Sequence, residues 1–180
     1  MQTHRLTAHP AYPPGSIRSV EARIGIAAHG WLQLRWRVEG SARLVVPPFA
    51  GRQRANRLWA TTCFELFCRS AGGTAYIELN LSPSERWAAY DFTASREGME
   101  DRSMSHQPVI SPRRGRDVLL LDASVRLGDL PPAPWDLGIS AVLEEEGGAL
   151  SYWALAHLSE RPDFHDPACF TVRLEPPGQP

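Results

Sequence analysis

Two glutamates and an asparagine are the residues best suited to chemistry, and they lie in neighbouring segments of alternating hydrophobicity. Glu65 belongs to segment 58–68, and Glu78 and Asn80 belong to segment 76–82. If these segments pair as a hairpin with their apolar stripes on one core, the three polar side chains share the opposite face. That face would offer carboxylate and amide groups for hydrogen bonding. The alternative is that both glutamates simply face water on an exposed sheet surface.

Aromatic residues favour the first interpretation. Trp59, Phe67 and Tyr76 have the same parity as the polar residues, and rings of this size are costly to leave bare unless something covers or occupies the face. These aromatic neighbours of the polar residues predict a concave face that can bind a ligand. Six residues of straight strand would separate Trp59 from Glu65 by roughly 20 Å, so we expect Trp59 on the loop that enters the strand.

Alternation with a period of two dominates the rest of the chain and indicates strands. Segments 20–26 and 31–38 are expected to form one hairpin, and 137–146 and 150–157 another. Segment 93–116 has no clear period and is interpreted as a long loop. The sequence therefore predicts an all-β fold of eight to ten strands in two packed antiparallel sheets, a jelly-roll-like β-sandwich.

Length and composition fit one domain. The chain has 180 residues, 43% of them hydrophobic, which is enough for a substantial core. We expect the domain to span residues 16–175, between an N-terminal extension (1–15) and a C-terminal tail (176–180). The net charge of −1 gives no basic field to attract nucleic acid or an anionic membrane.

Several chemistries are excluded by residue type. The sequence contains no lysine, so Schiff-base lysines and the Walker lysine are absent. Cys63, Cys68 and Cys169 match no zinc spacing, and with His157 and His165 they form no recognisable metal motif. No apolar run is long enough to span a bilayer, and the start lacks the apolar region of a signal peptide. We therefore expect a soluble, cytoplasmic protein without a metal site.

Four stretches carry a family resemblance. The runs at 58–67, 76–83, 152–157 and 162–167 resemble the DOMON-like superfamily, related to family 9 carbohydrate-binding modules. The resemblance covers roughly residues 16–175 and implies a β-sandwich that holds a sugar or haem. In the sugar-binding modules two aromatic rings clamp the sugar and polar side chains bind its hydroxyls. This implies Trp59 and Phe164 as platforms and Glu65 as a hydroxyl-binding acid.

The resulting prediction is a non-catalytic module that binds a small molecule, a sugar or sugar-like metabolite, without a cofactor. Three further residues join the predicted site. Arg96 follows a strand and could cap a pocket, while Trp153 and His157 share the parity of one strand face.

Two alternatives remain open. A haem-binding variant would use Met99 and His157 as axial ligands. A glycoside hydrolase would use Glu65 and Glu78 as its paired carboxyls.

Overall fold

A computed structural model describes residues 1–176 of the chain. Within this range the helical segments are four 3-10 turns, η1 (Ser41–Arg43), η2 (Leu58–Ala60), η3 (Leu127–Asp129) and η4 (Pro167–Cys169). None of these described helices is long and apolar enough to cross a membrane. The described strands are β1 (Gln2–Ala8), β2 (Ser19–Ala27), β3 (Trp31–Glu39), β4 (Cys63–Ser70), β5 (Tyr76–Leu81), β6 (Trp87–Phe92), β7 (Glu100–Asp101), β8 (Val109–Arg114), β9 (Val118–Arg126), β10 (Trp135–Glu145), β11 (Ala149–Ala154) and β12 (Val172–Leu174).

The strands form one curled antiparallel sheet. Their order is β7-β6-β5-β4-β10-β11-β1-β2-β3-β9-β8, and β12 pairs with β10 beside this path. The all-β prediction is confirmed, but two separate sheets are not observed. The reason is β1, whose first residues pair with β2 while Thr7 and Ala8 pair with β11. One strand therefore joins the two halves that the sequence was expected to keep apart.

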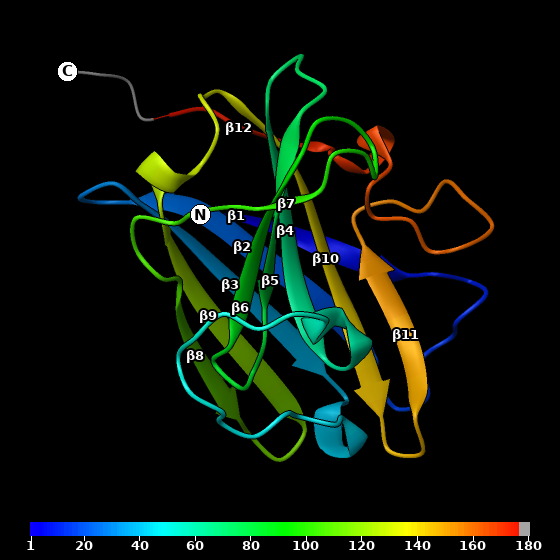
Figure 1. The fold of residues 1–180 in the computed structure, drawn as a ribbon. Coiled ribbons are helices and arrows are strands. Elements are labelled where there is room, and N and C mark those ends of the chain that lie inside the picture. The colour runs from blue at the N-terminus through cyan, green and yellow to red at the C-terminus, as the bar shows by residue number, and fades with distance from the viewer. Residues whose placement is uncertain (177–180) are drawn as a thin grey trace.

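Curling brings the two halves of the sheet together around a common core. In Figure 1 the strands β4, β5, β6 and β10 cross in front of β2, β3 and β9. Buried residues of both groups belong to one hydrophobic cluster, and the ring of Trp36 on β3 lies 5.5 Å from that of Phe64 on β4. The alternation in each strand is what allows this, because every second side chain can be buried in the shared core.

Several predicted elements are confirmed in outline. The hairpins β2–β3, β4–β5 and β10–β11 all form, and β6 follows β5 as expected. The start of segment 58–68 is not strand, because residues 58–60 form η2 and β4 begins at Cys63.

Two other segments differ from expectation. Residues 1–15 were expected to be an extension, yet Gln2–Ala8 is strand β1 of the sheet. Segment 93–116, expected to be a loop, contains the short strand β7 and the edge strand β8. Both differences arise because pairing with neighbouring strands of the sheet decides the structure of these weakly patterned segments.

Candidate functional site

The polar face predicted from strand parity exists, and the sheet register defines it. Phe64, Leu66 and Cys68 of β4 point into the core, so Glu65 and Phe67 point to the other side. Glu65 pairs with Asn80 of β5 and, on its other side, with Ser140 of β10. Because Glu78 pairs with Phe67, the two glutamates are diagonal neighbours on one face.

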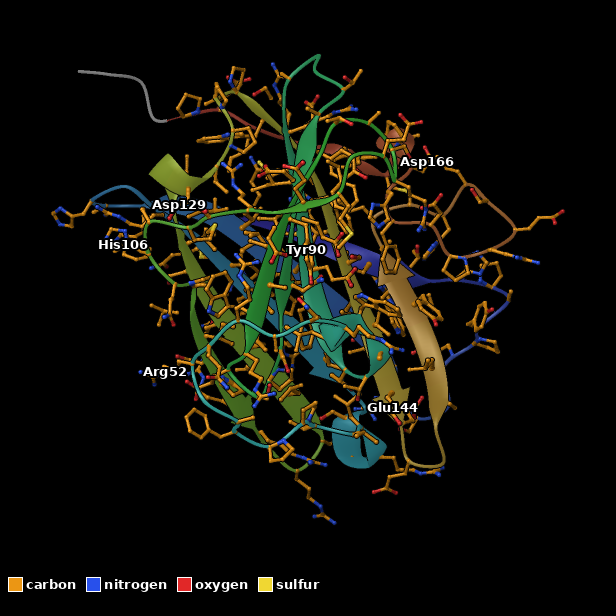
Figure 2. The ribbon with its side chains drawn as sticks, viewed as in Figure 1. Arg52, Tyr90, His106, Asp129, Glu144 and Asp166 are labelled. Atoms are coloured by element: carbon orange, nitrogen blue, oxygen red, sulfur yellow. The ribbon has the colours of Figure 1, made fainter. Side chains whose placement is uncertain are left out.

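A cavity of about 450 Å³ covers this face. Strands β4, β5, β6, β10 and β11 contribute to its wall, together with η2 and two loops that follow β6 and β11. Figure 2 places Tyr90 near the middle of the front strands, where it lines the cavity. The lining residues are Trp59, Glu65, Phe67, Glu78, Tyr90, Phe92, Arg96, Met99, Val142, Tyr152, Pro162, Phe164 and His165.

The two glutamates are buried in this wall, with exposed fractions of 3% for Glu65 and 6% for Glu78. Loss of hydration raises the pKa of both carboxyls, and the charge of Glu78 raises the pKa of Glu65 further. A hydrogen bond donated by the Ser140 hydroxyl to Glu65 Oε2, 2.9 Å long, acts in the opposite direction. The pair therefore holds a proton more readily than free carboxyls do.

Asn80 lies beside the pair but does not line the cavity. Its side chain is fully buried, and neither amide atom finds a hydrogen-bond partner of good geometry among the described residues. Its closeness to Glu78 nevertheless opposes the rise in the pKa of that carboxyl. The structure therefore places Asn80 behind Glu78 as a neighbour of the carboxyl.

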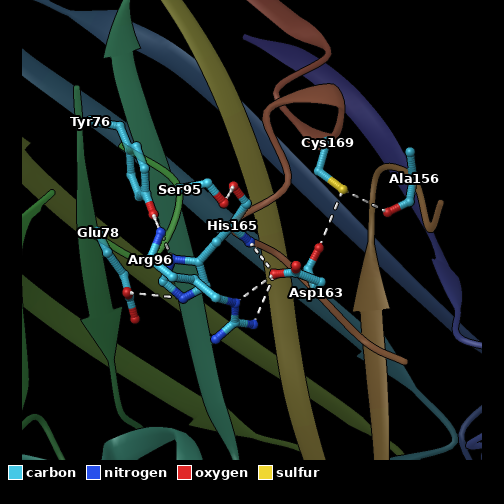
Figure 3. A network of polar contacts seen from close by, with 8 residues as sticks. All are labelled: Tyr76, Glu78, Ser95, Arg96, Ala156, Asp163, His165 and Cys169. Carbon is cyan, nitrogen blue, oxygen red and sulfur yellow. Dashed lines mark hydrogen bonds and ion pairs between the residues drawn. The ribbon is translucent and has the colours of Figure 1, made fainter. Parts of the chain in front are cut away.

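His165 closes one side of the cavity and is held by a polar network (Figure 3). The backbone N–H of Arg96 donates to the Tyr76 hydroxyl at 3.1 Å, and that hydroxyl lies 2.7 Å from His165 Nδ1. Burial and the Arg96 charge lower the pKa of His165 to about 4, so the imidazole is neutral near pH 7. If the Tyr76 hydroxyl donates to Nδ1, the ring proton lies on Nε2, which is 3.7 Å from Glu78 Oε2.

Arg96 lies at the rim of the cavity and links two loops. Its backbone has a positive φ of 59°, in the turn after β6. Its guanidinium donates two hydrogen bonds to Asp163 Oδ1, at 2.8 and 3.2 Å, and the same oxygen accepts the backbone N–H of His165. Arg96 therefore ties the loop after β6 to the loop that carries Phe164 and His165.

The two predicted platforms both line the cavity. Trp59 lies in η2, as the spacing argument required, and 48% of its surface is exposed. Phe164 is partly buried against Phe67 and Tyr152, with ring centroids 6.5 and 6.3 Å away. An exposed ring at the rim and a packed ring in the wall are both available to a ligand.

Two predicted site residues lie elsewhere. Trp153 faces the core of the protein, where its indole N–H donates to the Ser151 hydroxyl. His157 follows the end of β11 and contacts the carbonyl oxygen of Thr7 through Nε2, outside the cavity lining. Parity alone could not tell which side of β11 faces the cavity. The side chain that lines the cavity is that of Tyr152, the residue before Trp153.

The sequence prediction missed most of the wall. Tyr152 and Val142 could have been found by extending the parity argument across β10 and β11. The others depend on loop conformations or on the position of β6. The missed lining residues are Tyr90, Phe92, Met99, Val142, Tyr152, Pro162 and His165.

The residues of the haem and metal alternatives are scattered. Met99 lines the cavity but His157 does not, so the two are not brought together there. Cys169 is buried, and its sulfur lies 3.4 Å from the carbonyl oxygen of Ala156 and 3.6 Å from that of Asp163, either of which can accept its S–H. Burial raises its pKa to about 11. Within residues 1–176, no three histidine, cysteine or acidic side chains are arranged to hold a metal ion.

The fold and site together define an antiparallel β protein with an acidic, aromatic cavity on the outer face of β4 and β5. The chain matches no protein family model and no curated protein. Its fold is similar to that of a candidate carbohydrate-binding protein from Bacteroides uniformis, with a TM-score of 0.66 and 18% identity over 94% of this chain and 84% of that one. It is also similar to a family 9 carbohydrate-binding module from Caldicellulosiruptor kristjanssonii in complex with glucose, with a TM-score of 0.55 and 8% identity over 97% and 85%. At these identities the comparisons establish a shared fold.

Proposed function

We propose that the cavity binds a sugar or sugar-like small molecule without transforming it. The observation that carries this proposal is a cavity that combines aromatic surface with buried carboxyls on one sheet face. Aromatic faces pack against the C–H groups of a sugar ring, and carboxylates accept hydrogen bonds from its hydroxyls. Two solved structures with this fold are described as carbohydrate-binding, which supports the same class of ligand.

Membership of the DOMON-like superfamily, a cytoplasmic location and the lack of a cofactor belong to the same proposal. In it Trp59 and Phe164 supply apolar contact, and Glu65 and Glu78 supply hydrogen-bond acceptors. Arg96 closes the rim of the cavity.

A thermal-shift screen with mono- and disaccharides tests the proposal. A ligand at about 100 times its Kd stabilises the native state by about 2.7 kcal/mol, which raises Tm by roughly 5–10 °C for a chain of this size. Trp59→Ala should weaken binding about tenfold, by loss of roughly 1–2 kcal/mol of ring contact. Phe49→Ala is the matched control, because Phe49 is also exposed, at 67%, and does not line the cavity.

A shift that is equal in Trp59→Ala and Phe49→Ala would place binding elsewhere, and no shift with any saccharide would refute a sugar ligand. The buried pair Glu65 and Glu78 also favours a second candidate function, glycoside hydrolysis, because retaining and inverting glycosidases use two carboxyls. Turnover of aryl glycosides that disappears in Glu65→Gln would establish that second function and overturn the non-catalytic one.

A further inference from the structure

The cavity floor carries acidic groups that the described residues leave without a cation. Within residues 1–176, no arginine forms an ion pair with Glu65 or Glu78. The Arg96 guanidinium, at the rim, is already bound to Asp163 at 2.8 Å. His165 approaches Glu78 but is a neutral imidazole near pH 7. Burying a carboxylate without a cationic partner costs free energy. A positively charged group of a ligand would reduce that cost at this site.

Glu78 is the clearest sign of a missing partner. It is 94% buried and lines the cavity, and its polar neighbours among the described residues are the Asn80 amide, which opposes the rise in its pKa, and His165. His165 Nε2 lies 3.7 Å from Glu78 Oε2, which is longer than a hydrogen bond. Glu65, in contrast, accepts one from the Ser140 hydroxyl. Because a carboxylate has two acceptor oxygens, Glu78 keeps acceptor capacity for a group in the cavity.

Two of the hydrogen-bond donors around the cavity are already engaged. The Tyr90 hydroxyl donates to Asn56 Oδ1 at 3.1 Å, and the Arg96 guanidinium donates to Asp163. A neutral sugar needs donors for its hydroxyl oxygens as well as acceptors for its hydroxyl protons. An ammonium group needs acceptors alone, and the two buried carboxyls of the cavity supply them.

The aromatic wall favours the same kind of ligand. Six aromatic side chains line the cavity above the two carboxyls, and the faces of such rings attract organic cations. An acidic floor beneath aromatic walls combines charge-assisted hydrogen bonds with cation–π contacts. The six rings are Trp59, Phe67, Tyr90, Phe92, Tyr152 and Phe164.

We infer that the ligand is a protonated amine, and that its ammonium group is bound between Glu65 and Glu78 while its ring packs on the aromatic wall. This inference rests on the proposed function for the sugar part of the ligand, and it narrows that class to amino sugars and related polyhydroxylated amines.

The titration of the site adds a pH dependence. Burial and mutual repulsion make the carboxyl pair hold a proton that an entering ammonium must displace. Affinity for an amine that stays protonated should therefore rise with pH as the pair ionises. The charged and titratable groups that face the pair are His165, Arg96, Tyr76, Tyr90, Tyr152 and Cys63.

Calorimetric titration with matched probes tests the inference. The probes are glucosamine against glucose, and cyclohexylamine against cyclohexanol, each pair differing by an amine in place of a hydroxyl. We expect each amine to bind at least about tenfold more tightly than its neutral partner near pH 7. Titration of cyclohexylamine in two buffers of different ionisation enthalpy should also reveal proton release.

Variants assign the effect to the carboxyls. Glu78→Gln should remove the preference for amines and the proton release, while Glu100→Gln, on the exposed strand β7, should keep both. Circular dichroism checks that the variant folds, and Glu65→Gln provides a second test if Glu78→Gln does not.

The outcomes separate this inference from the proposed function. Glucose binding as tightly as glucosamine would overturn the inference and leave the sugar site intact. Cyclohexylamine binding without either sugar would support the ammonium site and refute the sugar class. Failure of all four probes would count against both.

Discussion

Burial of Glu78 beside Glu65 makes the stability of the ligand-free protein depend on pH. The pKa of each carboxyl is raised above its ordinary value of 4.5, so the folded state binds more protons than the unfolded chain above that pH. The stability that the protonated pair provides is complete below about pH 4.5 and is lost as pH rises through the raised pKa values.

Glu78→Gln should remove much of this loss, because one of the two charges can no longer form. We expect its free energy of unfolding, relative to the wild type, to be roughly 1–3 kcal/mol higher near pH 8 than near pH 5. Urea denaturation at both pH values measures this difference. The exposed variant Glu100→Gln should show almost none, and a Glu78→Gln difference independent of pH would contradict the account.

His165 has the opposite dependence, but it does not disturb that comparison. Its pKa is lowered to about 4, so the stability of the neutral ring is present above pH 6.5 and is lost as pH falls toward 4. Because every variant in the series keeps His165, its contribution largely cancels in the differences.

At the scale of elements, the end of β3 depends on a close backbone approach. Gly40 has a φ of 79°, and a Cβ atom there would lie 2.1 Å from the carbonyl oxygen of Ser16. The crossing segment is itself fixed, because the backbone N–H groups of Gly15 and Ser16 each donate to Glu145 at 2.6 Å. The segment at Ser16 cannot move away from Gly40 without breaking these bonds.

Gly40→Ala should therefore destabilise the protein by more than about 2 kcal/mol, through backbone strain and the clash together. Gly147→Ala is the matched control, because Gly147 also has a positive φ, 98°, but has open space around it. It should cost only about 1 kcal/mol. Equal losses of unfolding free energy in the two variants, measured by chemical denaturation, would show that the close approach at Gly40 adds nothing to the cost of the substitution.

The strand pair of the site could be predicted because side-chain parity is a local property. Glu65 and Glu78 follow directly from the alternation in β4 and β5, which has one apolar stripe each. Trp153 was placed on the wrong side, because both faces of β11 carry large side chains and only its pairing with Ala141 turns it toward the core. His165 could not be predicted, since its position depends on contacts with Tyr76 and Asp163 across a loop.

At the scale of the whole molecule, β1 holds the curled sheet together. Its backbone pairs with β2 and, at Thr7 and Ala8, with β11. This strand is hard to recognise from the sequence, because Leu6 is its only residue that is buried in the core. Pairing with β2 and with the distant strand β11 makes the strand, which is why the local pattern did not predict it.

Leu6→Ala should accordingly cost about 2–5 kcal/mol, since the side chain is 98% buried at the junction of the two halves. Its neighbour Arg5 is exposed, and Arg5→Ala should change the free energy of unfolding by less than about 0.5 kcal/mol. Thermal or urea unfolding compares them. Equal effects would show that β1 contributes no packing to the junction.

The position of Cys169 makes the rate at which its thiol is labelled a measure of local opening. The thiol is covered by the segment that carries Phe164 and His165, and its S–H can donate to the carbonyl oxygen of Ala156 or of Asp163. Its raised pKa keeps thiolate scarce, so a thiol reagent can react only in moments when this segment lifts away. The rate of labelling at Cys169 therefore reports how often that wall of the cavity opens. A ligand that stabilises the closed segment should lower this rate.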